Sequence, residues 1–109
     1  MERVSMLVLV ILSFTPLALG GKIYGSVAEG GKPVGQGVEV EITCGTNAYT
    51  SQTDAYGSFR LYVKDRGKCT LKVRYQKQSP SFEINSYDGS VQYDLILEKK
   101  DSQYTLRRR

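Results

Sequence analysis

Apolar and polar residues alternate along most of the chain after residue 21, and this period of two predicts β-strands. In the clearest run, 37–44, Val38, Val40, Ile42 and Cys44 fall on one side of the strand. Such runs, separated by turns rich in Gly, Pro, Asp and Asn, predict strands at 22–28, 37–44, 48–53, 58–63, 69–75, 80–84 and 91–98, with 103–106 as one more short strand or a docked tail. Strands at this spacing without a helical segment predict an all-β fold, a small antiparallel Greek-key β-sandwich of about seven strands.

One turn carries the most specific pattern in the chain. It reads Thr53-Asp54-Ala55-Tyr56-Gly57-Ser58-Phe59 and lies between two predicted strands. The Asp54 carboxylate is expected to accept a backbone hydrogen bond two residues on, and Gly57 to adopt a backbone angle that other residues resist. Phe59 then points into the core. We expect Asp54 to cap this turn rather than to bind a metal or act in catalysis, because no second carboxylate is near it in sequence.

The first 20 residues have the layout of a secretory signal peptide. Arg3 is followed by the apolar run 6–12, Pro16 interrupts a helix, and the small residues Ala18 and Gly20 occupy positions that a signal peptidase reads. A membrane anchor is the alternative, but the apolar run is well short of the roughly 20 residues that span a bilayer. We therefore predict cleavage after Gly20, a secreted or periplasmic protein, and no transmembrane anchor after cleavage.

The remaining residues, 21–109, are predicted to form one domain, with a core at 22–98 and a short basic tail at 99–109. A domain of this size buries only about 60 % of its unfolded surface, so a covalent link would help to stabilise it. Cys44 and Cys69 both fall on the inward side of their predicted strands, and in an exported chain we expect them to form a disulfide. Two buried free thiols are the alternative.

The composition argues against catalysis and against nucleic-acid binding. The chain has no histidine, so the commonest general base and metal ligand is missing, and its two distant cysteines make no zinc motif. The net charge of +4 at pH 7 is modest, and most Lys and Arg residues are scattered among the strands. We therefore expect a protein that is not an enzyme, with no catalytic residue, cofactor, metal or nucleic-acid partner.

Outward-facing tyrosines and basic residues are the candidate contacts for a ligand or partner. Tyr24 and Tyr62 fall opposite the core side of their strands, where an aromatic ring with a polar tip suits a sugar or a protein. The alternative is that these rings only pack against cross-strand neighbours.

Basic residues give two further candidates. Lys64, Lys72 and Arg74 share outward parity with Arg60, and they would form a basic stripe if their strands were neighbours. The alternative is an ordinary solvated face whose lysines discourage aggregation. The chain also carries three consecutive arginines, Arg107, Arg108 and Arg109. We interpret them either as a frayed tail or as a contact for an anionic lipid or envelope polymer.

Several of these motifs resemble the carboxypeptidase regulatory-like domain. The matching pieces, in order, are Gly25-Ser26-Val27, Pro33-Val34, Gly37-Val38-Glu39-Val40, Thr53-Asp54 with Gly57 and Phe59, and Gly67 before a strand. This family belongs to the transthyretin-like, or prealbumin-like, β-sandwiches and is grouped with carbohydrate-binding-like folds. The resemblance implies a fold and a non-catalytic accessory or interaction role, because the matched residues are structural ones.

The sequence thus favours an exported, non-catalytic accessory or protein-interaction module. Its expected partner is a protein of the envelope or the extracellular space. The second hypothesis is a carbohydrate-binding module that uses exposed tyrosines.

Overall fold

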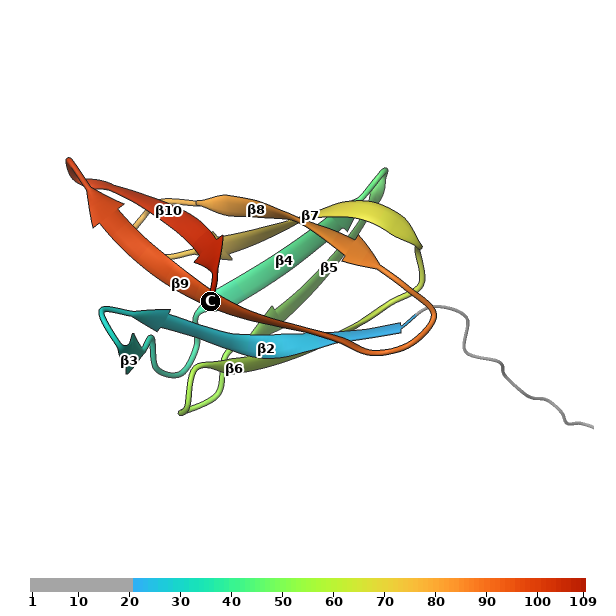
Figure 1. Ribbon diagram of the computed structural model, residues 1–109, viewed down its shortest axis with the longest axis horizontal. Helices are drawn as coiled ribbons and strands as arrows, with labels where there is room; N and C mark the ends of the chain where they lie inside the picture. Colours follow the sequence, from blue (N-terminus) through green and yellow to red (C-terminus); the bar gives the residue numbers. More distant parts are fainter. Residues whose placement is uncertain (1–20) are drawn as a thin grey trace, which may run out of the picture.

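The protein is a β-sandwich built from strands alone across residues 21–109, the part of the chain that the computed structural model describes (Figure 1). The predicted signal peptide, 1–20, lies outside these described residues. The strands are β2 (Gly21–Glu29), β3 (Lys32–Pro33), β4 (Glu39–Cys44), β5 (Asn47–Gln52), β6 (Ser58–Val63), β7 (Gly67–Arg74), β8 (Ser81–Ser86), β9 (Val91–Lys100) and β10 (Gln103–Arg108). The described region contains no helix long and apolar enough to cross a membrane.

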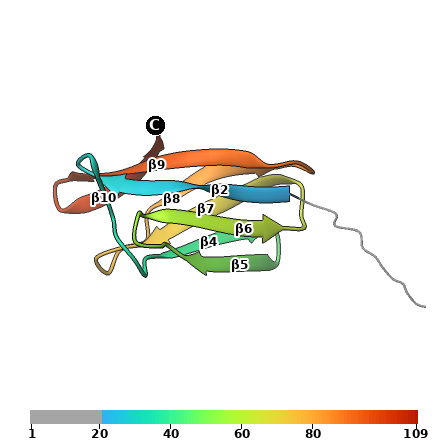
Figure 2. The same ribbon diagram turned by 90° about the horizontal axis from the view of Figure 1, so that it is seen from below.

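The strands form two sheets that pack face to face, as the turned view in Figure 2 shows. In the larger sheet β2 is central, with β9 and then β10 on one side of it. On its other side β2 pairs first with β6, along 21–26, and then with β3, at Ala28 and Glu29. The smaller sheet has the order β5-β4-β7-β8. Consecutive strands β6 and β7 therefore lie in different sheets.

The structure confirms the predicted all-β sandwich and adds two strands. Every end of the seven predicted strands lies within two residues of its predicted position. Of the two alternatives for 103–106, the strand is correct, because β10 pairs with β9 over its whole length. One pair departs from the antiparallel pattern: β2 and β9 run parallel, from Ile23 opposite Val91 to Glu29 opposite Leu97.

The core lies between the sheets and is formed by the inward positions that alternation marks. Both sheets contribute aliphatic side chains with almost no exposed surface. The buried cluster comprises Ile23, Val27, Val40, Ile42, Cys44, Phe59, Leu61, Val63, Cys69, Leu71, Val73, Ile84, Tyr93, Leu95, Leu97 and Leu106. Tyr93 is the one buried tyrosine of this cluster, and its hydroxyl donates to the backbone oxygen of Asn85 at 3.2 Å.

The predicted disulfide is present. Cys44 at the end of β4 and Cys69 in β7 are bonded, and their Cα atoms are 4.5 Å apart. The register places them directly opposite each other, one step beyond the Thr43–Thr70 pair. The bond therefore links neighbouring strands within the smaller sheet rather than joining the two sheets. A link across 25 residues stabilises the fold by about 3 kcal/mol through the lost freedom of the unfolded chain.

The Thr53 side chain ties the loop before β4 to the turn after β5. Thr53 is buried, with 2 % of its surface exposed. Its hydroxyl donates to the Gly35 oxygen at 2.6 Å and accepts from the Val38 amide at 3.0 Å. The hydroxyl therefore both donates and accepts a hydrogen bond within the fold, which gives this motif residue a structural role.

Asp54 caps the turn as the sequence predicts. One of its carboxylate oxygens accepts from the backbone amides of Tyr56 and Ser58, at 2.9 and 3.0 Å. Gly57 has a positive φ of 74°, and a Cβ there would lie 2.7 Å from the Val27 oxygen. The glycine thereby lets the turn dock on β2, where the Val27 amide donates to the Gly57 oxygen at 2.9 Å.

Candidate functional site

A polar groove lies on the outer face of the larger sheet, where β9, β2 and β6 run side by side. It has a volume of about 670 Å³ and is open to solvent. Its floor is made by outward-facing side chains of these three strands, and the turn after β5 supplies one wall. The lining residues are Lys22, Tyr24, Gly25, Ser26, Ser51, Gln52, Asp54, Ser58, Phe59, Arg60, Gln92 and Asp94.

Tyr24 occupies the centre of this outer-face groove. It lies opposite Arg60 on β6 and opposite Gln92 on β9, so its ring has a cationic neighbour on one side and an amide on the other. Lys22, two residues earlier on the same face, places its Nζ atom 5.0 Å from the centre of the Tyr24 ring. Tyr24 itself is half-buried, and Arg60 is exposed. An aromatic surface is therefore ringed by groups that donate hydrogen bonds.

The two carboxylates of the groove are held by neighbours. Asp94 accepts from the Ser26 hydroxyl at 3.0 Å and, through its other oxygen, from the Gln92 side-chain amide at 2.9 Å. Asp54 is fixed by the backbone amides of its own turn. These contacts orient the carboxylates and leave each with remaining acceptor capacity.

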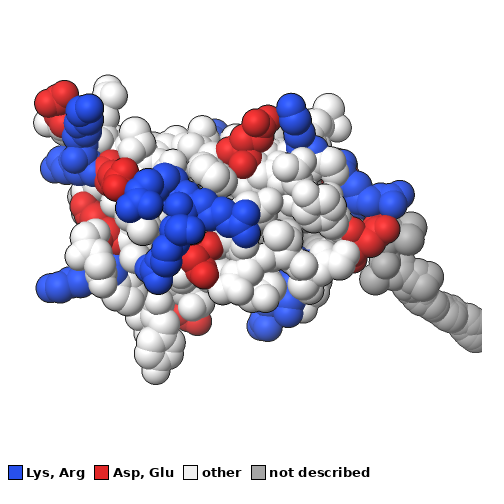
Figure 3. Space-filling model, viewed as in Figure 1, with Lys and Arg blue, Asp and Glu red and all other residues white. Residues whose placement is uncertain are grey.

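A second, smaller hollow adjoins the groove. Gln92, Asp94, Arg108 and Arg109 line it, and the first two also line the groove, so the two hollows adjoin at β9. Figure 3 shows basic side chains gathered around the C-terminal end of β10, at the position marked C in Figure 1. Together the hollows run across the sheet from β6 to the end of β10.

Arg107 and Arg108 are the last two residues of β10 and Arg109 follows directly, so the structure places the three arginines against the sheet rather than in a frayed tail. Arg107 forms an ion pair with Glu98 at 2.8 Å. Arg108 donates to the Gln92 backbone oxygen at 2.7 Å, and its guanidinium lies 4.5 Å from the centre of the Tyr93 ring. The Arg109 backbone amide donates a hydrogen bond to the backbone oxygen of Asp94 at 2.8 Å. Arg108 and Arg109 line the smaller hollow.

The predicted basic stripe does not form. Arg60 belongs to β6 in the larger sheet and Lys64 follows that strand, whereas Lys72 and Arg74 belong to β7 in the smaller sheet. The segment after Val63 crosses from one sheet to the other, so shared outward parity does not bring these side chains onto one face.

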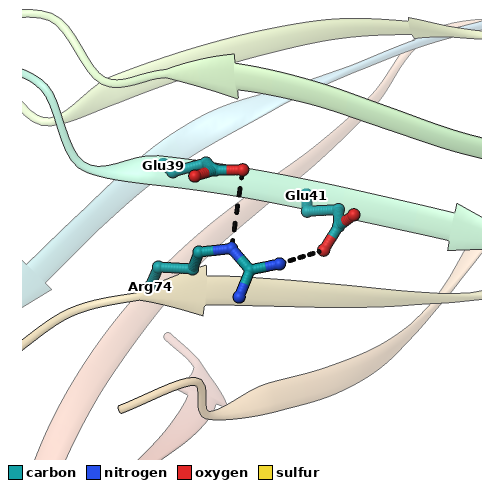
Figure 4. Close-up of polar contacts among 3 residues, drawn as sticks. All are labelled: Glu39, Glu41 and Arg74. Carbon is teal, nitrogen blue, oxygen red and sulfur yellow. Dashed lines mark hydrogen bonds and ion pairs between the residues drawn. The ribbon is translucent and has the colours of Figure 1, made fainter. Parts of the chain in front are cut away.

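Arg74 is also engaged by acidic neighbours on β4. It lies between Glu39, at 3.5 Å, and Glu41, at 2.9 Å (Figure 4). Two carboxylates flank one guanidinium there, which leaves no net positive charge for a partner. Arg74 is therefore better described as a cross-strand ion pair of the smaller sheet.

Of the two tyrosine candidates, Tyr24 lies in the groove and Tyr62 does not line it. Tyr62 is on the same outer face, opposite Lys22, with 69 % of its surface exposed. The sequence reasoning missed Gln92 and Asp94 as groove residues. The alternation of the sequence shows that Gln92 and Asp94 face outward. Only the parallel pairing of β2 and β9, however, places them beside Tyr24.

A separate polar cluster joins the two sheets away from the groove. The Glu29 carboxylate accepts hydrogen bonds from the hydroxyls of Tyr75 and Tyr104, each at 2.8 Å. The tyrosine rings meet edge to face, with centres 5.3 Å apart. The hydrogen bond to Glu29, followed by burial, raises the pKa of both tyrosines above 10.0. Across residues 21–109 no three His, Cys, Asp or Glu side chains gather in a way that could hold a metal ion.

Comparison with known proteins supports the fold. No protein-family model and no curated protein matches the sequence, so membership of the carboxypeptidase regulatory-like family stays a prediction. A proposed carbohydrate-binding protein from Bacteroides uniformis ATCC 8492 has a similar structure, with a TM-score of 0.53 and 16% sequence identity. The similarity covers 83% of this chain and 54% of that chain, so this protein spans about half the length of its structural neighbour.

A 9R-lipoxygenase from Cyanothece PCC8801 is also similar over a short part of its length. It is 20% identical, and the match covers 77% of this chain and 18% of the lipoxygenase, with a TM-score of 0.39. This similarity is too low to support an argument about fold or function.

Proposed function

We propose that the protein is an exported, non-catalytic binding module and that the outer-face groove binds carbohydrate. The observation that carries the proposal is the position of Tyr24, half-buried between Arg60 and Gln92 at the centre of the groove. A sugar ring has an apolar C–H face and a polar rim. An aromatic surface surrounded by hydrogen-bonding groups matches both.

Two further considerations support the proposal. The structural neighbour from Bacteroides uniformis is itself proposed to bind carbohydrate, although 16% identity speaks only to a shared fold. The absence of histidine from the whole sequence removes the commonest general base, which favours binding over catalysis. Export rests on the predicted signal peptide at 1–20.

Isothermal titration calorimetry of the secreted protein against a panel of neutral and acidic oligosaccharides tests the proposal. We expect at least one glycan to bind, and Tyr24→Ala to weaken that binding by about tenfold or more, since the substitution removes the aromatic surface. Tyr87→Ala is the matched control, because Tyr87 is exposed and lies outside the groove lining. Absence of binding to every glycan at millimolar concentration would count against a carbohydrate role.

A protein partner is the second candidate, and three exposed tyrosines favour it. Tyr56, Tyr62 and Tyr87 have 79%, 69% and 56% of their surfaces exposed. Tyr62 and Tyr87 both lie near the start of β2, since Tyr62 pairs with Lys22 and the Tyr87 backbone packs against Gly21. Tyrosine is enriched in protein interfaces. Affinity capture from an envelope extract, with a Tyr62→Ala/Tyr87→Ala variant as comparison, tests this role; equal capture by both proteins would refute the tyrosine contact.

A further inference from the structure

We infer that the outer-face groove selects an acidic glycan of low charge density, a polysaccharide that carries carboxylates on some of its sugars and none on the others. This inference rests on the proposed carbohydrate binding and adds the chemical class of the ligand. It comes from the arrangement of four cations and two fixed carboxylates around Tyr24 and the adjoining hollow.

Two cations line the groove itself and two line the adjoining hollow. Arg60 and Lys22 lie beside Tyr24, and Arg108 and Arg109 line the hollow across β9. Among residues 21–109, no carboxylate lies within ion-pair distance of any of these four side chains, whereas Arg74 and Arg107 are both paired. Four positive charges with no acidic partner in the described region therefore face a site that holds two carboxylates.

The strand register places one of these cations, Arg60, where it can bind a carboxylate of the ligand. Arg60 and Tyr24 are cross-strand partners, so their Cβ atoms lie about 5 Å apart on the same face. A sugar ring that stacks on Tyr24 would bring a carboxylate on its edge next to the Arg60 guanidinium. A planar guanidinium can bind a carboxylate through two parallel hydrogen bonds.

The two carboxylates of the groove limit how much negative charge the ligand can carry. Asp94 lies between the two hollows, and Asp54 forms part of the groove wall. A densely charged polymer, such as a heavily sulfated glycan or a nucleic acid, would place anions next to these groups and be repelled. A chain that alternates acidic and neutral sugars can place a carboxylate at Arg60 and a neutral, hydroxyl-rich sugar at Asp94. The hydroxyls of that neutral sugar can donate to the Asp94 oxygens.

Calorimetry with a matched pair of ligands tests the inference. The first ligand is a tetrasaccharide that alternates glucuronate and N-acetylglucosamine, and the second is the same tetrasaccharide with its carboxylates reduced to alcohols. We expect the acidic form to bind the secreted protein about tenfold more tightly, as one charge-assisted contact predicts. Arg60→Gln should remove most of that difference between the acidic and the reduced form. Lys68→Gln, which removes one charge from β7 of the opposite sheet, should leave the difference unchanged.

The other outcomes distinguish a failure of this inference from a failure of the proposed carbohydrate binding. Equal affinity for the acidic and reduced tetrasaccharides, or a difference that survives in Arg60→Gln, overturns the inference and leaves carbohydrate binding intact. If no glycan in the panel binds, both the inference and the proposed carbohydrate binding are overturned. Tighter binding to a heparin-like sulfated tetrasaccharide, or to vesicles of anionic phospholipid, overturns the low-charge-density argument. Both results would instead indicate a general anion surface.

Discussion

Gly25 packs so closely against Tyr93 that a Cβ at position 25 would clash with the Tyr93 backbone oxygen. The two residues are opposite each other in the parallel β2–β9 pair. The glycine therefore allows β2 and β9, the strands that carry Tyr24 and Gln92, to pair this closely beneath the groove. No side chain can be accommodated there without moving one strand from the other.

Gly25→Ala should therefore lower stability strongly. We expect a loss of more than about 2 kcal/mol in the free energy of unfolding, measured by urea denaturation, because backbone rather than a flexible side chain blocks the new methyl group. Gly89→Ala is the control, since an added Cβ there meets nothing within 4 Å. Equal stability of the two variants would contradict the close approach of β2 and β9.

Removal of the disulfide should weaken the fold without changing its architecture. A Cys44→Ala/Cys69→Ala variant is expected to lose about 3 kcal/mol of unfolding free energy, because the unfolded chain regains the freedom of a long loop. The measurement is urea unfolding of the variant beside the oxidised wild type. Reduction of the wild type with dithiothreitol should reproduce the shift. An unchanged midpoint of urea unfolding in both experiments would show that the disulfide does little to restrict the unfolded chain.

Thr53→Val should cost about 1–3 kcal/mol although it preserves size. The substitution removes the hydroxyl that accepts from the Val38 amide and leaves that amide without its partner. Thr53→Ser keeps the hydroxyl and loses only a methyl group, so it should retain more stability than the valine variant. Thermal unfolding of both proteins gives the comparison, and a valine variant as stable as the wild type would refute the role of the hydroxyl.

The Glu29 cluster predicts a stability loss at alkaline pH. Below pH 10 Tyr75 and Tyr104 are neutral in both folded and unfolded chains, so their contribution is fully present. Above pH 10 the unfolded chain releases these protons first, because Glu29 holds the folded pKa values higher, and stability falls until the raised pKa is passed.

The measurement is urea unfolding at about pH 9 and about pH 11 for wild type and a Tyr75→Phe/Tyr104→Phe variant. The variant lacks the two shifted groups, so its stability should fall less between the two pH values. All other side chains are the same in both proteins, so their contributions cancel in the comparison. A parallel fall in both would show that the Glu29 hydrogen bonds do not perturb the two tyrosines.

The local features of the fold were predictable because each depends only on residues that are close together in the sequence. Alternation placed Phe59 inside and Tyr24 outside, Asp54 had the spacing of a turn cap, and the parity of Cys44 and Cys69 allowed a disulfide. The groove was not predictable in the same way, since Tyr24, Arg60 and Gln92 come from three strands. Their meeting depends on the direction and order of pairing.

The basic stripe depended on its strands being neighbours, and that condition fails for a related reason. Arg60 and Lys72 lie on strands that are consecutive in the chain, and consecutive strands usually neighbour each other. Here the connection at 64–66 passes between the sheets, so β7 pairs with β4 and β8 instead of with β6. Alternation alone contains no signal that separates a hairpin from such a crossing.

The parallel pairing of β2 with β9 also dictates when the domain can finish folding. Ile23 meets Val91, so the first strand of the described region completes its hydrogen bonding only with residues far along the chain. Contacts between such distant segments slow folding. One edge of β2 therefore lacks its partner until β9 is available to pair with it.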